Sequence, residues 1–275
     1  MKLEDLFKQP QALPAIPKIV HELIDSFNNE SILIEEITDK LSKDPVLSAR
    51  LLRLANSAYY HVSRTVGTVD DAVMMLGFVT VRTLVISSGL TRGFKPMPGI
   101  NLPDFWRYSM HAAATARWLA KKTSNNTDQA FTLGLMHAIG QLIMHSGMAE
   151  AMFSVDKQAD PLDSRRFAIE SGSFGYHFGN VGAELARQWK FPPSFADALD
   201  QFDNPTGHTP PDDMALIMHV AAWRARAEYQ GMSMEELQAT VPSAACQALG
   251  QDAQKLLQDM PPMSELCEGL EALVE

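Results

Sequence analysis

Residues 131–145, FTLGLMHAIGQLIMH, form an apolar stretch that constrains the fold of this chain more than any other segment. Its length and composition suit a helix at the centre of a domain. His137 lies in the middle of the stretch and is followed by Ala138. A histidine followed by an aspartate on such a helix would be a metal-binding pair, because imidazole and carboxylate groups hold divalent metals that activate water for phosphoester hydrolysis. In this chain the carboxylate is missing.

The composition is that of a globular protein with a core, and it argues against broad nucleic-acid binding. Hydrophobic residues make up 46% of the 275 residues, and 33 acidic against 23 basic residues give a formal net charge of -10. Binding to a phosphate backbone needs a basic face, which this balance does not favour. Two basic pairs, Arg165–Arg166 and Arg224 with Arg226, are interpreted as solvated helix surface, as charge runs usually are.

Cysteine usage and hydropathy predict a cytoplasmic protein without membrane contact. Cys246 and Cys267 lie late in the chain, and their separation suits neither a disulfide framework nor a zinc site. Idle thiols of this kind are typical of a reducing compartment. The N-terminal segment MKLEDLFKQP lacks the apolar core of a signal peptide, and no apolar run reaches transmembrane length.

Helix signals recur along the whole chain. Asp44–Pro45 predicts a helix start, because the aspartate caps the helix and the proline opens it. Thr68 is a second N-cap, and Gly77 is a predicted C-terminal stop. Ser233 and Glu236 have the spacing of a capping box.

Three further segments define the organisation. FVTVRTLVISS, residues 78–88, favours a strand by its β-branched residues, but it runs into helical segments and lacks a second strand to pair with, so we predict a helix. The proline- and glycine-rich segment 93–103 is the best candidate linker. Asn28–Asn29 is expected to end one helix, and Ser31 to cap the next.

Several motifs resemble one known family. The N-terminal half contains LPAIPKIVHELI, LSKDPVLSARLLRLANSAYY and TVDDAVMMLGFVTVRTLVIS, and the C-terminal half contains FWRYSMHAAATARWLA, GLMHAIGQLIM and FGYHFGNVGAELARQWKFPPSF. The DP pair, the LANSAYY segment and the A-x-x-x-LG turn are typical of the HDOD family, the HD-related output domains of bacterial signalling. The resemblance covers about residues 10–230 of the chain.

The resemblance implies an all-α protein. We expect an N-terminal helical bundle over residues 1–95, packed on a degenerate HD-like helical bundle over residues 100–230. Residues 231–275 are expected to form a C-terminal helical extension, which either packs on one of the bundles or contributes to a homodimer contact.

The HDOD family is related to the metal-dependent HD phosphohydrolases, including those with the HD-GYP signature. By this resemblance, the His-Asp pair of those enzymes falls on His137 and Ala138. A lysine that often follows the glycine falls on Gln141. The early histidine of the first HD helix falls on Tyr108, with His111 one turn further on.

The remaining HD positions lie in the second half of the bundle. A later histidine matches His177, and a His-His pair falls near residues 201–203. The final metal aspartate falls on Ala222, so both key carboxylates are absent. A phosphohydrolase metal site needs negative ligands to bind the ion and to lower the pKa of its water. We therefore expect no catalytic residue, no metal and no cofactor.

Alternatives for the remaining histidines stay open. They are expected to be hydrogen-bonded core residues left from an enzymatic ancestor. A small-anion pocket between His111, His137 and His177 is a second interpretation, and a three-imidazole zinc site is a third. The corresponding functions are a non-catalytic regulatory module, a small-anion sensor, and a phosphohydrolase acting on a nucleotide or cyclic dinucleotide.

A possible partner surface lies in LANSAYY. Asn56 is interpreted as a helix cap or inter-helix clamp, with a contact to a partner as the functional alternative. Tyr59 and Tyr60 are amphipathic and could line such a surface. Because the chain leaves no room for a further signalling domain, we expect an unidentified signalling protein to act in trans.

Overall fold

The computed structural model describes residues 1–27 and 34–270, and all regular structure in these ranges is helical. The predicted all-α fold is therefore confirmed. Residues 78–88, ambiguous by propensity, lie in a helix as predicted. The predicted helix end at Asn28–Asn29 and the predicted cap at Ser31 lie outside the described residues.

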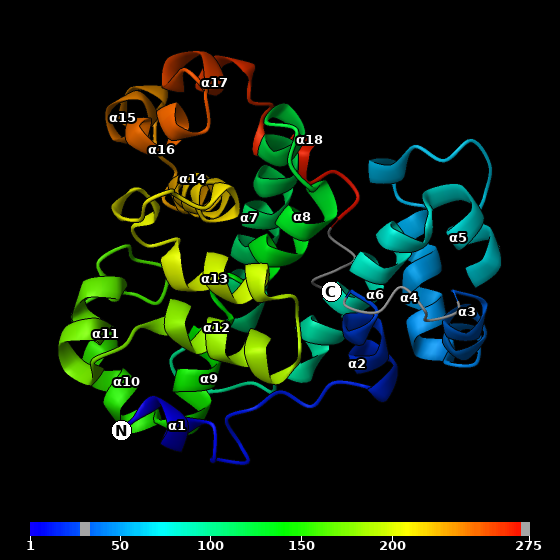
Figure 1. Cartoon of the computed structure of the whole chain (residues 1–275), viewed down its shortest axis with the longest axis horizontal. Helices are drawn as coiled ribbons and strands as arrows, with labels where there is room; N and C mark the ends of the chain where they lie inside the picture. The colour runs from blue at the N-terminus through cyan, green and yellow to red at the C-terminus, as the bar shows by residue number, and fades with distance from the viewer. Residues whose placement is uncertain (28–33, 271–275) are drawn as a thin grey trace.

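The first bundle lies on the right in Figure 1. It contains α2 (Lys18–Asp25), α3 (Ile34–Ser42), α4 (Pro45–Ala55), α5 (Val69–Leu76) and α6 (Phe78–Gly93), with a 3₁₀ turn at Ala58–Tyr60. Helix α6 contacts α2, α4 and α5 of the first bundle and also α8 of the second bundle. Its largely buried sequence explains this position, because a helix apolar on most sides needs partners all round.

The second bundle is larger. It contains α7 (Leu102–Lys122), α8 (Thr127–Met136), α9 (Ile139–Gly147), α10 (Ala149–Asp156), α11 (Arg166–Phe174), α12 (Phe178–Gln188), α13 (Pro193–Gln201) and α14 (Asp213–Tyr229), with a 3₁₀ turn at Pro205–Gly207. Helix α7 packs on both α8 and α14. Its run of alanines at residues 112–114 is buried, which allows the neighbouring helices to approach closely.

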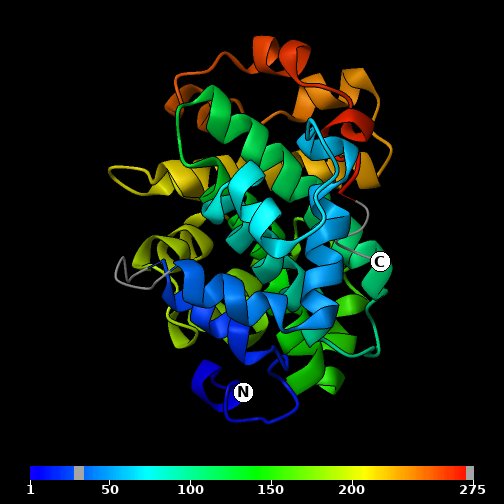
Figure 2. The same cartoon turned by 90° about the vertical axis from the view of Figure 1, so that its right-hand side faces the viewer.

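Helix α1 and the C-terminal extension both pack on the second bundle. Helix α1 (Leu3–Leu6) buries Leu6 beside Gly147, at the end of α9. The C-terminal extension contains α15 (Met234–Thr240), α16 (Ser243–Ala248), α17 (Ala253–Asp259) and α18 (Met263–Leu266). It packs on α14 through α16 and on α7 through α18, and Figure 2 shows it along one end of the molecule. The extension therefore packs within the chain; a homodimer stays a prediction.

The local helix signals have the predicted geometry. Asp44 accepts hydrogen bonds from the backbone N–H groups of Val46 and Leu47, each at 3.0 Å. The Thr68 hydroxyl accepts from the Asp71 N–H at 3.0 Å. Gly77 separates α5 from α6 with a φ of +81°, a conformation that favours glycine. The Ser233 capping box is also formed.

The prediction of one continuous helix over residues 131–145 was wrong at its centre. Helix α8 ends at Met136 and α9 begins at Ile139. The Nδ1 atom of His137 lies 2.7 Å from the carbonyl oxygen of Gly134, the oxygen that the N–H of residue 138 would use in a continuous α-helix. The side chain replaces the backbone as donor, which is a known way of interrupting a helix.

Across residues 1–27 and 34–270, every helix falls short of the length and apolarity that a membrane crossing requires.

Candidate functional site at the break between α8 and α9

His137 occupies the break and is 1% exposed. Since the Gly134 carbonyl can only accept, Nδ1 carries the proton and Nε2 carries a free lone pair. Nε2 is buried and has no hydrogen-bond partner among the described residues. Burial lowers the pKa of His137 to about 4, so the ring is neutral at physiological pH. Metal-binding histidines commonly adopt this pose, with one ring N–H held by a backbone carbonyl.

Aromatic side chains enclose the imidazole. The Tyr108 ring lies 5.0 Å and the Phe202 ring 5.9 Å from the His137 ring, measured between centroids. The Tyr108 hydroxyl reaches to 3.5 Å from the carbonyl oxygen of Ala222. Tyr108 therefore fills space between α7 and α14 next to the position that a metal aspartate would occupy.

The residues present do not fit a divalent metal. Ala138 and Ala222 are buried, at 2% and 3% exposure, and neither offers a ligand atom. Within the described ranges, no group of three or more histidine, cysteine, aspartate or glutamate side chains converges as a metal site would require. His137 keeps one suitable nitrogen atom, but its neighbours are aromatic rings rather than oxygen donors.

The His177 side chain caps the start of α12. Its Nδ1 accepts a hydrogen bond from the Gly179 N–H at 3.1 Å, while the Asn180 side chain accepts from the His177 N–H at 3.0 Å, forming a capping box at the start of α12. The neutral ring therefore carries its proton on Nε2, which lies 3.6 Å from a carboxylate oxygen of Asp203. Burial lowers the pKa of His177, against the opposing effect of the Asp203 charge.

His111 and Gln141 face other parts of the bundle. Burial lowers the pKa of His111, whose charged surroundings are Glu228, Arg107 and Arg224. No hydrogen bond or ring contact joins His111 to His137 in the described part of the chain. The Gln141 amide donates to Glu170 at 2.8 Å and accepts from Arg166 at 3.0 Å. Among the five predicted pocket residues, the described part of the chain has one ring contact, between Tyr108 and His137, and no side-chain hydrogen bond joins any two of them.

Arg166 is the centre of a buried ionic network, so its interpretation as solvated surface was wrong. Its side chain is 0% exposed, and its guanidinium group donates to Glu170 at 2.9 Å, to Asp156 at 2.7 Å and to the Ala159 carbonyl at 2.9 Å. Asp156 also lies 3.1 Å from Nε2 of His145. The network joins α9, α10 and α11, which explains why a full charge can be buried there.

Arg224 was likewise wrongly interpreted as solvated, whereas Arg226 is half-buried. Arg224 is buried at 9% exposure and pairs with Glu228 at 2.9 Å. Arg226 donates to the Leu162 carbonyl at 2.9 Å and lines a cavity of about 380 Å³ together with Phe202, Ala222 and other residues. This cavity adjoins the aromatic enclosure, because Phe202 belongs to the walls of both, but its described lining includes none of the five predicted pocket residues. The resemblance placed two HD positions on its walls, near residues 201–203 and at Ala222, whereas its other walls come from distant segments that no local pattern joins.

The LANSAYY segment is tied to its own chain. The Asn56 side chain donates to the carbonyls of Leu52 and Val66, at 2.7 and 2.9 Å, and accepts from the Val66 N–H at 2.8 Å, so it clamps the loop after α4. Tyr59 and Tyr60 are half-buried and face a cavity bounded by α7 and α18. Burial raises the pKa of Tyr60 to about 12.

Comparison with known proteins identifies the family. Residues 13–205 match the HDOD domain, which is most of both bundles. The chain belongs to the HDOD family. The matched range contains Tyr108, the break at His137 and His177, while α14 and the C-terminal extension lie beyond it.

Solved HDOD-like structures share the fold. A candidate phosphohydrolase from Shewanella amazonensis SB2B is 32% identical, with 99% of this chain and 97% of that one covered at a TM-score of 0.78. An HDOD domain protein of unknown function from Geobacter sulfurreducens is 22% identical, with 99% and 95% covered at a TM-score of 0.76. A candidate signal transduction protein from Marinobacter aquaeolei VT8 is 22% identical, with 99% and 60% covered at a TM-score of 0.67.

Curated relatives are longer than the matched region. An uncharacterised protein of Treponema pallidum is 22% identical over 211 residues, which are 76% of this chain but 41% of that protein. An uncharacterised Bacillus subtilis protein matches over 47% of this chain and 32% of its own length. The chain thus spans well under half of the curated relatives that it matches.

Proposed function

We propose that this HDOD protein is a non-catalytic signalling module that acts on other proteins through direct contacts. The observation that carries the proposal is the chemistry around His137. One imidazole keeps the pose of a metal ligand, but Ala138 and Ala222 stand at the carboxylate positions, and Tyr108 and Phe202 enclose the ring. Such a site cannot neutralise a divalent cation or generate a metal-bound hydroxide.

A second candidate function is metal-dependent phosphoester hydrolysis. It is favoured by the free lone pair on Nε2 of His137 and by the 32% identical Shewanella protein, which is itself described as a candidate phosphohydrolase. A shared fold does not establish a shared activity, because proteins with different functions can have the same fold.

Photocrosslinking in the native cell tests whether the protein acts through direct contacts with other proteins. A photoreactive residue replaces Met74, which is 77% exposed on α5 of the first bundle, and in a second variant Phe153, which is 61% exposed on α10 of the second bundle. We expect a discrete protein adduct at one of the two positions after irradiation. Absence of adducts at both positions, with both variants folded, would contradict the proposal.

A further inference from the structure

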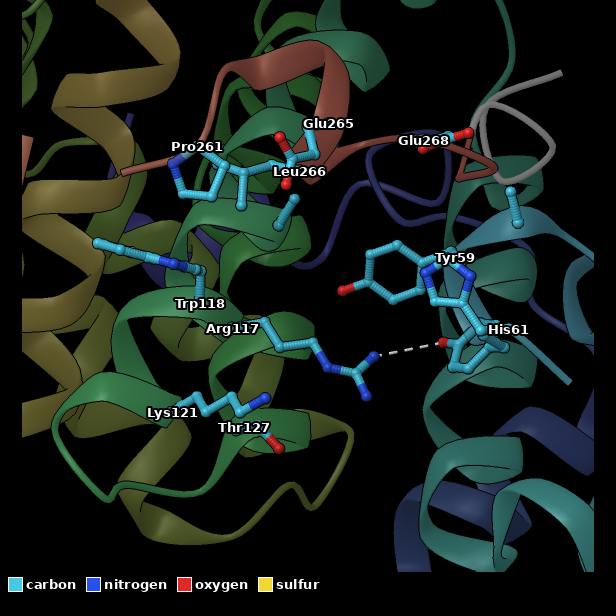
Figure 3. Close-up of a pocket in the computed structure, with 13 residues that line it drawn as sticks. Tyr59, His61, Arg117, Trp118, Lys121, Thr127, Pro261, Glu265, Leu266 and Glu268 are labelled. Atoms are coloured by element: carbon cyan, nitrogen blue, oxygen red, sulfur yellow. Dashed lines mark hydrogen bonds between the residues drawn. The ribbon is translucent and has the colours of Figure 1, made fainter. Parts of the chain in front are cut away.

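We propose that a cavity between the Ala58–Tyr60 turn, α7 and α18 binds a small anionic ligand whose flat ring carries N–H donors. We name this space the seam cavity; it is lined from all three segments and by Thr127 at the start of α8 (Figure 3). Its volume is about 910 Å³, within the range that holds small molecules. It is separate from the His137 enclosure, so the inference is independent of the proposed function.

Arg117 supplies an incompletely paired charge to the seam cavity. Its side chain is 22% exposed, and its ion pair with Asp128 spans 3.9 Å. Its donation to the Tyr60 hydroxyl spans 3.4 Å. Both distances exceed the 2.7 to 2.9 Å, roughly, of a strong charge-assisted hydrogen bond. The guanidinium carbon also lies 5.3 Å from the Tyr59 ring centroid, so the aromatic rings orient the group without using all of its donors.

The same end of the cavity carries further groups suited to an anion. Lys121, one helical turn after Arg117, is exposed, and both Lys121 and Thr127 line the cavity (Figure 3). Two cations and a hydroxyl on neighbouring positions match a phosphate or carboxylate group. Trp118 contributes an aromatic face to the lining between this end and Pro261. A flat ring can stack there, as bases do on aromatic side chains.

The opposite wall has the opposite charge. Glu265 and Glu268 line the cavity from the C-terminal extension, next to Leu266. Carboxylates there disfavour a second anionic group and accept hydrogen bonds from N–H donors. A ligand with an anion at one end and ring N–H groups at the other can bind both the basic wall and the acidic wall. Inorganic phosphate can bind only the basic wall.

Gly269 lies where the C-terminal extension meets the Ala58–Tyr60 turn. Its φ is +82°, and a Cβ atom there would lie 2.9 Å from the backbone nitrogen atoms of Ala58 and Tyr59. Only glycine allows this approach of the extension to the turn without a shift of the backbone. Gly269 therefore lets the extension pack directly on the turn, next to the lining residue Glu268.

Two classes of small molecule carry this chemistry, namely nucleoside monophosphates and indole carboxylates. Isothermal titration of the full chain uses AMP, GMP and indole-3-acetate as probes, with adenosine, guanosine and inorganic phosphate as half-ligands. We expect at least one probe to bind at one site per chain, at least about tenfold more tightly than any half-ligand. AMP or GMP binding assigns the nucleotide class, and indole-3-acetate binding alone assigns the carboxylate class. Binding by none of the three overturns the proposal.

Substitutions that spare the core locate the binding. We expect Lys121→Gln to lower the affinity for the bound probe about threefold or more, and Trp118→Leu to lower it about tenfold. Arg107→Gln is the matched control, because it removes a cation from the same helix at a 58% exposed side chain outside the cavity, and it should leave affinity unchanged. Unchanged affinity in both cavity variants overturns the proposal.

Glu265→Gln tests the orientation of the ligand. If the carboxylate accepts ring N–H donors, the substitution weakens AMP, GMP or indole-3-acetate binding, because a charge-assisted hydrogen bond is lost. If the carboxylate only repels the anion, the substitution tightens binding, and that result overturns the bipolar ligand that we propose.

Discussion

Two buried side chains, His137 and Arg166, differ in the number of polar groups that surround them. His137 has one hydrogen bond, to a backbone carbonyl, and remains neutral because burial opposes protonation. Arg166 donates hydrogen bonds to two carboxylates, one side-chain amide and one backbone carbonyl. The number of polar partners decides whether a buried charge is tolerated.

The low pKa of His137 predicts a loss of stability in mild acid. The folded-state pKa of about 4 lies below the ordinary value of 6.5, so the unfolded chain binds the proton first. The contribution is fully present above pH 6.5 and is lost as pH falls towards 4. Between pH 7 and 5 it amounts to about 2 kcal/mol.

Urea unfolding of the wild type and of His137→Leu at both pH values measures this contribution. The other buried histidines are common to both proteins, so the difference in pH dependence isolates His137. The variant should lose about 2 kcal/mol less than the wild type between pH 7 and 5. Equal losses would show that the ring is protonated without penalty.

Removing Arg166 should be strongly destabilising. Arg166→Met leaves Glu170, which is also fully buried, without its cation, at a cost of about 3 to 5 kcal/mol in the free energy of unfolding. The neighbouring Arg165 is the matched control: its side chain is 66% exposed and pairs with Asp163 at the surface, so Arg165→Met should cost far less than Arg166→Met. Similar unfolding free energies for the two variants would contradict the network.

At the scale of helices, local signals were predictable and tertiary contacts were not. The caps at Asp44, Thr68 and Ser233 depend on residues within one turn, and the structure has all three. The break after Met136 depends on the rotamer of His137, which the apolar pattern of the segment does not encode. The contact of α9 with α12 depends on Gly140, which packs against the backbone of Phe178, a residue far later in the chain.

Gly140 permits that contact, and its replacement should disrupt it. A Cβ atom at Gly140 would lie 2.0 Å from the backbone oxygen of Phe178, so one of the two helices must move. Gly140→Ala should therefore cost about 3 kcal/mol in the free energy of unfolding. Gly172→Ala is the control, since a Cβ atom there meets nothing within 4 Å, and helix propensity predicts no loss or a gain of up to about 1 kcal/mol. Thermal or urea unfolding of both variants would refute the contact if their stabilities matched.

At the scale of the whole molecule, the resemblance predicted the fold better than the site. The all-α class followed from motifs spread over both bundles, and the match over residues 13–205 agrees with it. The predicted pocket drew its residues from aligned positions, but side-chain direction depends on local partners: His177 turns to its helix cap and Gln141 to Arg166. The seam cavity joins segments about 200 positions apart, beyond the reach of local patterns.

The central claim is that the His137 enclosure does not support metal-dependent catalysis. The direct measurement is the metal content of the purified protein after incubation with manganese, combined with turnover of bis(p-nitrophenyl) phosphate by the same sample and by His137→Ala. We predict substoichiometric manganese and the same background turnover in both proteins. One tightly bound manganese ion per chain, with turnover abolished by His137→Ala, would contradict the account.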